Sequence, residues 1–335
     1  MTTGWGVIGT GLHAERIVSP VLGESSSTKF VAAGDISLER ARSFADRHGI
    51  ERVYDSLEKM LEDPELDVLY IATPNNLHVQ QTVLAAEAGK HVLCEKPMAL
   101  TVADCELMIQ ACHKNRVRLG VCFQNRYHPA HIEARRYIQS GAVGEINVAK
   151  VQFGRAHITM QGWRSDPKIA GAGALVGQGV HAIDLLRYLM DSEVIEVMAM
   201  TNAEPPRRPL EEMAHVILKF DNGTYAAMIC GILVPRSDND AVLYGSKAKV
   251  TCNGTVGMGL EGKLLVEGDS INVDMSFPTD DPGSMNYVRV REDFNRWIEG
   301  SSEPSITGEN GLQMVRIINA IIKSSHKGKT VRIGS

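Results

Sequence analysis

The sequence of 335 residues lacks several features that would commit it to particular partners or compartments. Its six cysteines form no C-x-x-C pair and show no zinc-ligand spacing, so we expect buried, reduced thiols and no metal site. Basic residues are dispersed and the formal charge is −5, which argues against nucleic-acid and membrane-surface partners. We find neither a leader-like N-terminus nor an apolar run of roughly 18 residues, the length that crosses a bilayer. We therefore expect a cytoplasmic protein.

The sequence does contain enough apolar material for two domains of ordinary size, with 44% hydrophobic and 22% charged residues. Up to residue 123, near-continuous apolar segments alternate with amphipathic ones. The predicted strands are 5–9, 30–35, 67–73, 91–95 and 117–123, and the predicted helices between them include 38–49, 77–89 and 102–115. Strands that are apolar throughout are buried on both faces, as in a parallel sheet. Residues 1–123 are thus predicted to form a Rossmann domain, a doubly wound parallel sheet of the α/β class.

Residues 124–335 show a different pattern, with a helix over 129–140 followed by strand-like segments. The predicted strands are 146–154, 194–200, 214–220, 224–233, 241–244, 270–277 and 330–333. The turns 221-DNG-223 and 253-NG-254 indicate hairpins. Two further helices are predicted over 284–299 and 309–324. This half is therefore predicted to be an α+β domain with a large, mostly antiparallel open sheet.

The stretch 9-GTGLHA-14 follows the first predicted strand directly and opens a helix. It matches the pattern G-x-G-x-x-[GA], in which the glycines permit a tight turn and close approach to a pyrophosphate. We expect this loop to bind a dinucleotide through Gly9, Thr10, Gly11 and Leu12.

Asp35 ends the second predicted strand, where an acidic residue accepts hydrogen bonds from the adenosine ribose. A carboxylate there repels a 2′-phosphate and so favours NAD. Arg40 lies one helical turn further on and either pairs with that phosphate or is a solvated helix residue. The expected cofactor is NAD, with NADP possible.

The segment 95-EKPMALT-101, together with the glycine loop and 179-GVHAID-184, resembles the glucose–fructose oxidoreductase/inositol dehydrogenase/rhizopine catabolism (Gfo/Idh/MocA) family. The resemblance covers essentially the whole chain and includes 124-QNRYHP-129 and 162-GWR-164. It implies that Lys96 is catalytic and contacts both cofactor and substrate, and that Glu95 lines the cofactor. Pro97 independently favours an extended Lys96 at the carboxyl end of its strand, where ligands bind in open α/β sheets.

The same resemblance implies further cofactor contacts, in three segments of the chain. Those after the fourth strand and in the N-R pair are Thr73, Pro74, Asn75, His78 and Asn125. A third group consists of Trp163, Arg164 and Tyr287, for which the alternative is a plain packing role.

His181 and Asp184 share one face at the predicted start of a helix, after the glycine-rich stretch 171–179. We expect this stretch to be a loop that brings backbone close to the nicotinamide and directs His181 toward the substrate. The positive end of the helix dipole would lower the pKa of His181 and keep its imidazole neutral, ready to act as a general base. The alternative for His181 is a buried core histidine. Asp184 is expected to orient His181, to cap the helix or to touch a substrate hydroxyl.

In sugar- and inositol-oxidising members of the family an aspartate usually lies four residues before this histidine, where the present chain has Gly177. The missing carboxylate weakens a polyol assignment and leaves room for a bulkier or less hydroxylated substrate. Arg155 and His157, on one face of a predicted strand, are further candidates for substrate contact, or lie on a solvated or interface surface.

These features together predict an NAD(P)-dependent oxidoreductase acting on a CH–OH or carbonyl carbon of a sugar-like or cyclic substrate, with Lys96 and His181 moving the proton. Alternatives are an aromatising dehydrogenase of a cyclic dihydrodiol, an enzyme that uses bound NAD for transient oxidation, and a dinucleotide-binding sensor without catalysis. The resemblance also implies that residues 124–335 bind substrate and mediate oligomerisation, giving a homodimer or homotetramer.

Overall fold

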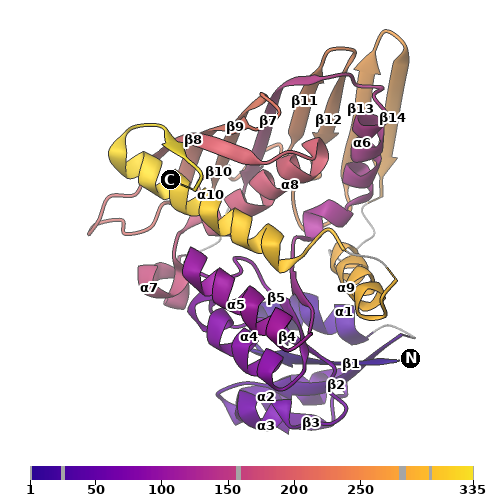
Figure 1. Cartoon of the computed structure of the whole chain (residues 1–335), viewed down its shortest axis with the longest axis vertical. Helices are drawn as coiled ribbons and strands as arrows, with labels where there is room; N and C mark the ends of the chain where they lie inside the picture. The colour runs from indigo at the N-terminus through magenta and orange to yellow at the C-terminus, as the bar shows by residue number, and fades with distance from the viewer. Residues whose placement is uncertain (1, 24–26, 156–159, 279–283, 302–303, 335) are drawn as a thin grey trace. The chain divides into compact units, whose positions relative to one another are not determined.

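The computed structural model describes the 335-residue chain except residues 1, 24–26, 156–159, 279–283, 302–303 and 335 (Figure 1). The residues group into two compact units. Unit 1 comprises Met1–Cys122 and Tyr287–Val315, and unit 2 comprises Phe123–Asn286 and Arg316–Ser335. We predicted a single domain over 124–335, whereas the structure groups Tyr287–Val315 with the N-terminal unit.

Unit 1 is built on a six-stranded sheet in which every neighbouring pair of strands is parallel. The strands, in the order β3-β2-β1-β4-β5-β6, have the bounds β1 Thr3–Ile8, β2 Thr28–Gly34, β3 Arg52–Tyr54, β4 Val68–Ile71, β5 His91–Cys94 and β6 Leu119–Val121. The order reverses between β1 and β4, and the crevice outside the carboxyl ends of strands at such a reversal is where open α/β sheets bind ligands. The predicted Rossmann sheet is confirmed.

Helices connect these strands, and several begin at a residue whose hydroxyl caps the first turn. Their bounds are η1 Ala14–Val18, α1 Ser19–Gly23, α2 Leu38–His48, α3 Leu57–Leu61, η2 Asn75–Leu77, α4 His78–Glu87 and α5 Val102–Lys114. Ser37, Ser56 and Thr101 each accept the backbone N–H three residues on. Such a cap is worth about 1 kcal/mol. The caps explain why α2 and α5 begin where the amphipathic pattern begins.

The late segment belongs to unit 1 because α9, Met285–Ile298, packs on the first strand. The indole of Trp5 is fully buried, donates its Nε1–H to Asn295 Oδ1 at 3.1 Å, and meets Phe294 edge to face at 5.8 Å between ring centroids. A Cβ added at Gly120 on β6 would lie 2.8 Å from Phe294, so this glycine admits the aromatic ring. Trp5 and Asn295 are 290 positions apart, a separation that no local pattern bridges.

Unit 2 is built on a nine-stranded sheet of the order β14-β13-β12-β11-β7-β10-β9-β8-β15. Only β10 and β7 pair in parallel, and the other seven pairs are antiparallel. The bounds are β7 Ile146–Gly154, β8 Val194–Thr201, β9 Met213–Phe220, β10 Tyr225–Gly231, β11 Ala241–Gly245, β12 Ala248–Asn253, β13 Gly262–Gly268, β14 Ile271–Phe277 and β15 Val331–Arg332. The large, mostly antiparallel sheet is therefore as predicted.

The two predicted turns have different outcomes. The 221-DNG-223 turn joins β9 to β10, and Gly223 has the left-handed φ of +90° that such a turn requires. The 253-NG-254 turn was predicted to be equally tight, yet residues 254–261 separate β12 from β13. A hairpin connection is present at this second place, but the predicted turn length is wrong and the two strands that it joins were not predicted.

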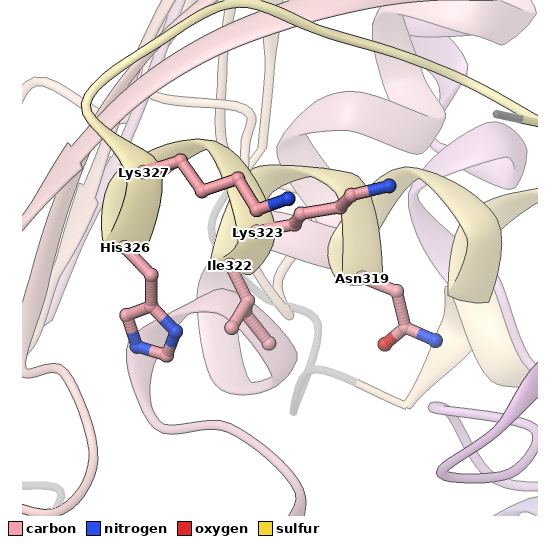
Figure 2. Close-up of a pocket in the computed structure, with 5 residues that line it drawn as sticks. All are labelled: Asn319, Ile322, Lys323, His326 and Lys327. Atoms are coloured by element: carbon pink, nitrogen blue, oxygen red, sulfur yellow. The ribbon is translucent and has the colours of Figure 1, made fainter.

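Helices of unit 2 pack on one face of this sheet, with α6 and α8 beside β7 and β12–β13 (Figure 1). The helical segments of unit 2 are η3 Gln124–Tyr127, α6 Pro129–Gln139, η4 Gly162–Ser165, α7 Pro167–Ala170, η5 Leu175–Gly179 and α8 Val180–Met190. The helix α10, Gly308–Lys327, belongs to unit 1 through Val315 and to unit 2 from Arg316 on. Two serines tie the end of α10 to β8, because Ser324 accepts the N–H of Ala199 and Ser325 that of Thr201. The other side of α10 forms an open hollow, lined by Asn319, Ile322, Lys323, His326 and Lys327 (Figure 2).

One helical stretch of the described residues, Pro167–Met190, is long and apolar enough to cross a membrane by length and composition. It comprises 24 residues, and 78% of its most apolar window is buried inside the protein. Within it, α8 buries all of its residues except Tyr188. Burial of this kind is that of a core helix, since apolar side chains all round a helix have to be covered by protein or lipid.

Candidate active site

The glycine loop lies at the reversal of the parallel sheet and has the backbone that its sequence requires. Gly9 has a φ of +94°, and a Cβ there would lie 2.9 Å from the Ala72 backbone. A Cβ at Gly11 would meet no atom within 4 Å, which leaves the backbone open to a ligand. Ala14 is fully buried where η1 begins, as a small packing residue should be. The loop thus fits a dinucleotide pyrophosphate.

Asp35 follows β2 and accepts hydrogen bonds through both carboxylate oxygens. Oδ2 accepts from the Thr10 N–H at 3.0 Å and the Thr10 hydroxyl at 3.1 Å, and Oδ1 accepts from the Ser37 N–H at 3.0 Å. Arg40 adds a two-point ion pair, from Nε to Oδ2 at 3.1 Å and from a terminal nitrogen to Oδ1 at 2.5 Å. Burial alone would raise the pKa of Asp35, but the hydrogen bonds from Arg40 and two backbone N–H groups lower it. The Arg40 guanidinium is therefore paired with Asp35 in this structure, rather than only solvated or unpaired and ready for a 2′-phosphate.

Two large apolar side chains beside this carboxylate are exposed. Leu12 in the glycine loop is 65% exposed, and Ile36, directly after Asp35, is 90% exposed. Single exposed apolar residues are common on protein surfaces, but two of them flank the end of β1 and β2 where a planar base would rest. Ile36 is a candidate contact that the sequence reading missed, since nothing in its local pattern separates it from an ordinary loop residue.

The side chain of His78 connects the loop after β4 to the segment after β5. His78 is fully buried, and its two ring nitrogens face the carbonyl oxygens of Thr73 at 3.1 Å and Pro97 at 3.0 Å. Burial lowers its pKa. We predicted His78 as a cofactor contact; in the structure both of its ring nitrogens are turned to backbone carbonyls, so its ring joins two loops. Thr73, Pro74 and Asn75 remain candidate contacts.

Glu95 ends β5 and is buried in a small polar network. Its Oε1 accepts from the Tyr70 hydroxyl and from His13 Nε2, both at 2.7 Å, and its Oε2 accepts from the Lys96 N–H at 3.2 Å. Burial alone would raise the pKa of Glu95, but the charge and hydrogen bond of His13, followed by the charge of Lys96, bring it to about 2. Glu95 is therefore a carboxylate at all ordinary pH values. Tyr70 and His13 were missed, because 25 and 82 residues separate them from Glu95.

Lys96 itself lies at the carboxyl end of β5 with a half-buried side chain. The following residues through Ala99 are buried, so the lysine stands at the edge of a fixed segment. Tyr287, the first residue of the late part of unit 1, is 4% exposed, and its ring meets that of His13 edge to face at 6.0 Å. A structural role for Tyr287 accounts for this packing.

In unit 2 the glycine-rich stretch is helical rather than a loop, which corrects our expectation for His181. The π-helical turn η5 covers Leu175–Gly179 and continues directly into α8. His181 therefore lies beyond the first turn, where the positive end of the dipole has little effect. It is 5% exposed, and its ring meets Phe153 edge to face at 6.0 Å. The argument that a helix start lowers the pKa of His181 therefore does not apply.

The start of this helical stretch is occupied by a side chain from elsewhere in the chain. Glu211 Oε1 accepts the N–H of Gly173 at 2.8 Å and that of Leu175 at 2.9 Å. A Cβ at Gly173 would lie 2.0 Å from the Glu211 carbonyl oxygen, so only glycine admits this approach. Burial raises the pKa of Glu211, against the lowering effect of these N–H groups. An internal carboxylate thus fills the position that an anionic ligand would otherwise take.

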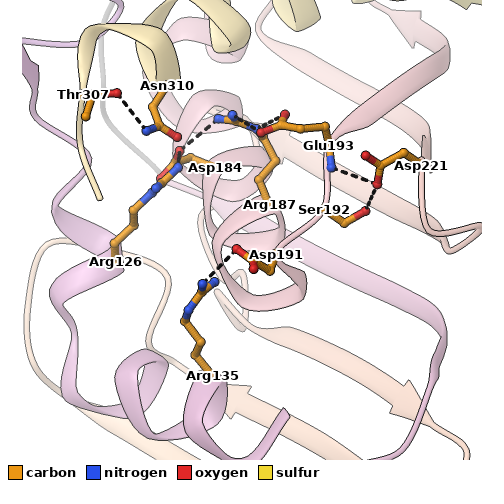
Figure 3. A network of polar contacts seen from close by, with 10 residues as sticks. All are labelled: Arg126, Arg135, Asp184, Arg187, Asp191, Ser192, Glu193, Asp221, Thr307 and Asn310. Atoms are coloured by element: carbon orange, nitrogen blue, oxygen red, sulfur yellow. Dashed lines mark hydrogen bonds and ion pairs between the residues drawn. The ribbon is translucent and has the colours of Figure 1, made fainter. Parts of the chain in front are cut away.

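Asp184 is committed to an internal ion pair, which corrects its predicted substrate contact (Figure 3). Its oxygens accept from Arg126 at 2.7 and 2.6 Å, and Arg187 lies 3.5 Å away. The side chains of Asp184 and Arg126 are 1% and 6% exposed. Arg187 in turn pairs with Glu193 at 2.7 Å. Both oxygens of Asp184 are thus engaged by Arg126, which therefore has a structural role in unit 2.

Next to this pair, buried amides lack hydrogen-bond partners within the described part of the chain. Asn125 is 1% exposed, and neither its Oδ1 nor its Nδ2 has a partner there. The Oε1 atoms of Gln124 and Gln178, 1% and 2% exposed, are in the same condition. Nearly all buried polar groups in proteins are satisfied, so these amides fit a site that a polar ligand completes.

The remaining predicted residues of unit 2 are more exposed. Arg164 stacks on Trp163, with the guanidinium 4.3 Å from the ring centroid, in the short turn η4. Arg155 lies just past β7, is exposed and donates to Met258 Sδ at 3.2 Å. His157 lies outside the described residues. None of the described histidine, cysteine and acidic side chains gathers in threes as a metal site would need. All six cysteines are buried and unbridged.

The parallel sheet, the glycine loop at its reversal and Asp35 at the end of β2 define a dinucleotide-binding protein. Residues 3–123 match the oxidoreductase family with an NAD-binding Rossmann fold known as GFO/IDH/MocA, and residues 131–251 match the C-terminal domain of the same family. The chain belongs to the Gfo/Idh/MocA family and is an NAD-binding oxidoreductase.

Similar proteins cover nearly all of the chain. A 1,5-anhydro-D-fructose reductase of Ensifer adhaerens is 29% identical over 98% of each chain. A trans-1,2-dihydrobenzene-1,2-diol dehydrogenase of Danio rerio is 30% identical over 86% of this chain and 84% of its own. Among solved structures, an aldose–aldose oxidoreductase of Caulobacter crescentus complexed with glycerol superposes with a TM-score of 0.90, at 28% identity over 99% of this chain and 100% of its own.

Proposed function

We propose that this oxidoreductase transfers a hydride between the nicotinamide of NAD and a carbinol or carbonyl carbon of a sugar-like or cyclic polyol, with Lys96 and His181 handling the hydroxyl proton. The observation that carries the proposal is Lys96, whose backbone N–H is held by the buried Glu95 carboxylate at the carboxyl end of β5. That edge of the sheet also carries the glycine loop. The names of two relatives, a reductase of an anhydro sugar and an aldose oxidoreductase, support the substrate class.

The chemistry divides between cofactor and protein. When bound, the nicotinamide takes up or returns the hydride. Oxidation of a carbinol also frees a hydroxyl proton, and a side chain within hydrogen-bond reach has to accept it. In this proposal Lys96 hydrogen-bonds the reacting oxygen, and the buried imidazole of His181 takes the proton during oxidation and returns it during reduction. Asp184 acts only indirectly, by fixing Arg126 on the helix that carries His181.

The adenosine end of the cofactor is assigned to Asp35 and the loop around it. Asp35 is ionised and would accept from the ribose hydroxyls, while Leu12 and Ile36 offer apolar surface to the adenine. Arg40 occupies both oxygens of Asp35, so it has to yield part of that contact when ribose binds. If it turns outward it can meet a 2′-phosphate, which keeps NADP as a possible second cofactor.

A second candidate substrate is a cyclic dihydrodiol. Gly177 lacks the carboxylate that polyol-oxidising members of the family carry, and a Cβ there would meet no atom within 4 Å. One relative is named as a dehydrogenase of such a diol. A substrate with few hydroxyl groups requires fewer polar partners, which suits a helix face without that aspartate.

We also propose a cytoplasmic homodimer or homotetramer. Exposed apolar side chains form two register pairs on the open face of the unit 2 sheet, since Met198 pairs with Ile217 and Tyr225 with Val148. Exposed apolar side chains that gather on one face are typical of a subunit interface. Light scattering coupled to gel filtration gives the subunit number; a monomer at all concentrations would contradict this part.

The proposal is tested with a substrate panel and two variants. Sugars, inositols, 1,5-anhydro-D-fructose and cyclic dihydrodiols are assayed with NAD and NADP, or with the reduced cofactors, at 340 nm. On the best substrate, Lys96→Ala and His181→Ala should each lower kcat/KM by about 10²- to 10⁴-fold, the usual contribution of a general acid–base group.

Matched controls separate chemistry from damage to the fold. Lys59→Ala removes a lysine that is 64% exposed in the same unit as Lys96, and His113→Ala removes a histidine that is 72% exposed. Both should leave kcat/KM within about twofold, as surface substitutions usually do. Retention of kcat/KM within about threefold in the Lys96 and His181 variants contradicts the assigned roles. Turnover of dihydrodiols but of no sugar favours the second candidate substrate.

A further inference from the structure

The buried carboxylate of Glu95 accepts hydrogen bonds from three donors and so connects three segments of unit 1. The proposed chemistry does not explain this connection. Glu95 is 8% exposed, and its two oxygens accept from His13, Tyr70 and the backbone of Lys96. An ionised carboxylate can only accept, so His13 Nε2 carries the hydrogen that it donates. The Tyr70 hydroxyl also lies 3.5 Å from Cys122 Sγ and is buried at the end of β4.

The position of His13 makes this network more than an ion pair. His13 is the residue at which the glycine loop turns into helix, four positions after Gly9. Its side chain is 30% exposed and its ring packs against Tyr287 of α9. The charged and titratable groups around it are Glu95, Lys96, Tyr70 and Tyr287. One hydrogen bond therefore ties the loop assigned to the pyrophosphate to the strand end that bears Lys96.

We propose that His13 is a positioning residue, which acts through Glu95 to hold the glycine loop and Lys96 in one fixed arrangement. The proposal rests on the assigned role of Lys96. His13 itself need not touch substrate or cofactor.

The physical reason lies in the cost of leaving a buried carboxylate short of a donor. A buried ion pair adds little net stability, but removal of one partner leaves a charge without compensation. Without His13, burial would raise the pKa of Glu95, because the charge and hydrogen bond of His13 are the main influences that lower it. As pH falls, Glu95 would then become protonated in the variant at a pH at which it stays ionised in the native protein. A protonated Glu95 is a weaker acceptor for the Lys96 backbone, so Lys96 loses its anchor.

Two substitutions separate the hydrogen bond from the space that the ring fills. His13→Gln keeps an N–H donor, and His13→Phe keeps the ring but has no donor. His48→Phe is the control, because His48 also pairs with a carboxylate in unit 1, Glu15 at 3.0 Å, and is similarly exposed at 25%. That pair is remote from Lys96 in sequence and shares no partner with the Glu95 network.

The measurements are NADH binding by fluorescence titration, and kcat and KM on the best substrate of the panel from pH 5 to 8. In His13→Phe we expect the NADH Kd to rise about tenfold and kcat to fall about tenfold, with the substrate KM within about threefold. His13→Phe should also lose activity toward acid pH earlier than the native enzyme. His13→Gln and His48→Phe should stay within about twofold on each measure.

The outcomes distinguish this inference from the proposed function. If His13→Phe matches His48→Phe in NADH Kd, kcat and pH profile, the positioning role is wrong, whatever Lys96→Ala does. If Lys96→Ala keeps its activity, the proposed function fails, and the NADH titration still reports whether His13 orders the loop. Should His13→Phe not fold, Tyr70→Phe removes the second donor to the same oxygen with little change of shape. A kcat within about twofold of native for Tyr70→Phe would then contradict the network's role.

Discussion

The two glycine-rich segments of this chain look alike in sequence and differ in structure. Both precede a helix, and both were expected to present backbone to a ligand. Gly9 in the first segment has a left-handed φ of +94°, and Gly11 beside it is open. The second segment is mostly helical, and its first N–H groups are already taken by Glu211. One helix start is available to an anion, and the other is filled by the protein itself.

The comparison shows that glycines serve two purposes that composition does not separate. Gly9 provides a backbone conformation and Gly173 provides space, because a Cβ at Gly173 would lie 2.0 Å from a backbone oxygen. Gly177 is required for neither, since its Cβ would be free of contacts. A run of glycines therefore predicts close approach somewhere in the segment without saying which residue needs it or what approaches.

The largest expected effect is that of Gly9→Ala. The new Cβ would meet the Ala72 backbone at 2.9 Å in a left-handed conformation, so we expect a loss of about 3–4 kcal/mol and at least a 100-fold rise in NADH Kd. Gly11→Ala should keep the native stability of the protein while weakening NADH. Thermal unfolding and fluorescence titration measure both. Native NADH affinity in Gly9→Ala would show that the loop does not bind the dinucleotide.

Gly173→Ala should destabilise by about 3 kcal/mol through overpacking against the Glu211 backbone. The matched substitution Gly177→Ala, four residues on in the same helical stretch, should stabilise by up to about 1 kcal/mol because alanine favours helix over glycine. Urea unfolding of the two variants gives the difference directly. Equal changes in the free energy of unfolding would show that the close approach of the Glu211 backbone does not require glycine at position 173.

Removal of the internal cap should have an intermediate effect. Glu211→Ala leaves two buried N–H groups without an acceptor and is expected to cost about 2 kcal/mol, whereas Glu211→Gln keeps an acceptor and should cost less. The pKa of Glu211 is raised in the folded state, so this carboxyl costs stability as pH rises from its ordinary value through the raised one. Glu211→Gln should remove that dependence. Unfolding free energies at pH 4.5 and 8 for both proteins test it; the same pH slope in both would contradict it.

The smallest expected effect concerns Asp35, whose carboxylate is expected to exchange part of its contact with Arg40 for the ribose of the cofactor. Arg40→Ala removes one donor from each oxygen of Asp35 and should lower the NADH Kd about threefold, while raising the NADPH Kd by a similar factor. Titration of both cofactors against the native protein shows the ratio. An unchanged ratio would leave Arg40 as a partner of Asp35 alone.

Much of the fold and of the nucleotide loop was predictable, because the signals are local. The amphipathic pattern of 38–49 and the caps at Ser37 and Thr101 lie within a few residues of what they determine. The strand β7 was found with its exact bounds, Ile146–Gly154. The strands β3, β12 and β13 were missed, since each is short or half-polar and depends on its neighbours for pairing.

The site was harder to predict, because its contacts join distant positions. Asp184 was expected to touch substrate, yet Arg126, 58 residues earlier, encloses it. His181 was expected at a helix start, yet the helix begins before Leu175 under a cap from residue 211. His13 lies within the glycine-loop motif 9–14, yet its contact with Glu95 was not predicted, since the two residues are 82 positions apart.

By itself the sequence determined the parallel sheet, the glycine loop, Asp35 at the end of a strand and the presence of Lys96 and His181, because apolar periodicity and short motifs act over a few residues. Only the tertiary structure decided which polar groups are already satisfied within the protein. Glu211 and Arg126 use hydrogen-bonding capacity that the sequence had assigned to ligands, and a carboxylate or N–H group can serve a ligand only if no distant residue reaches it first.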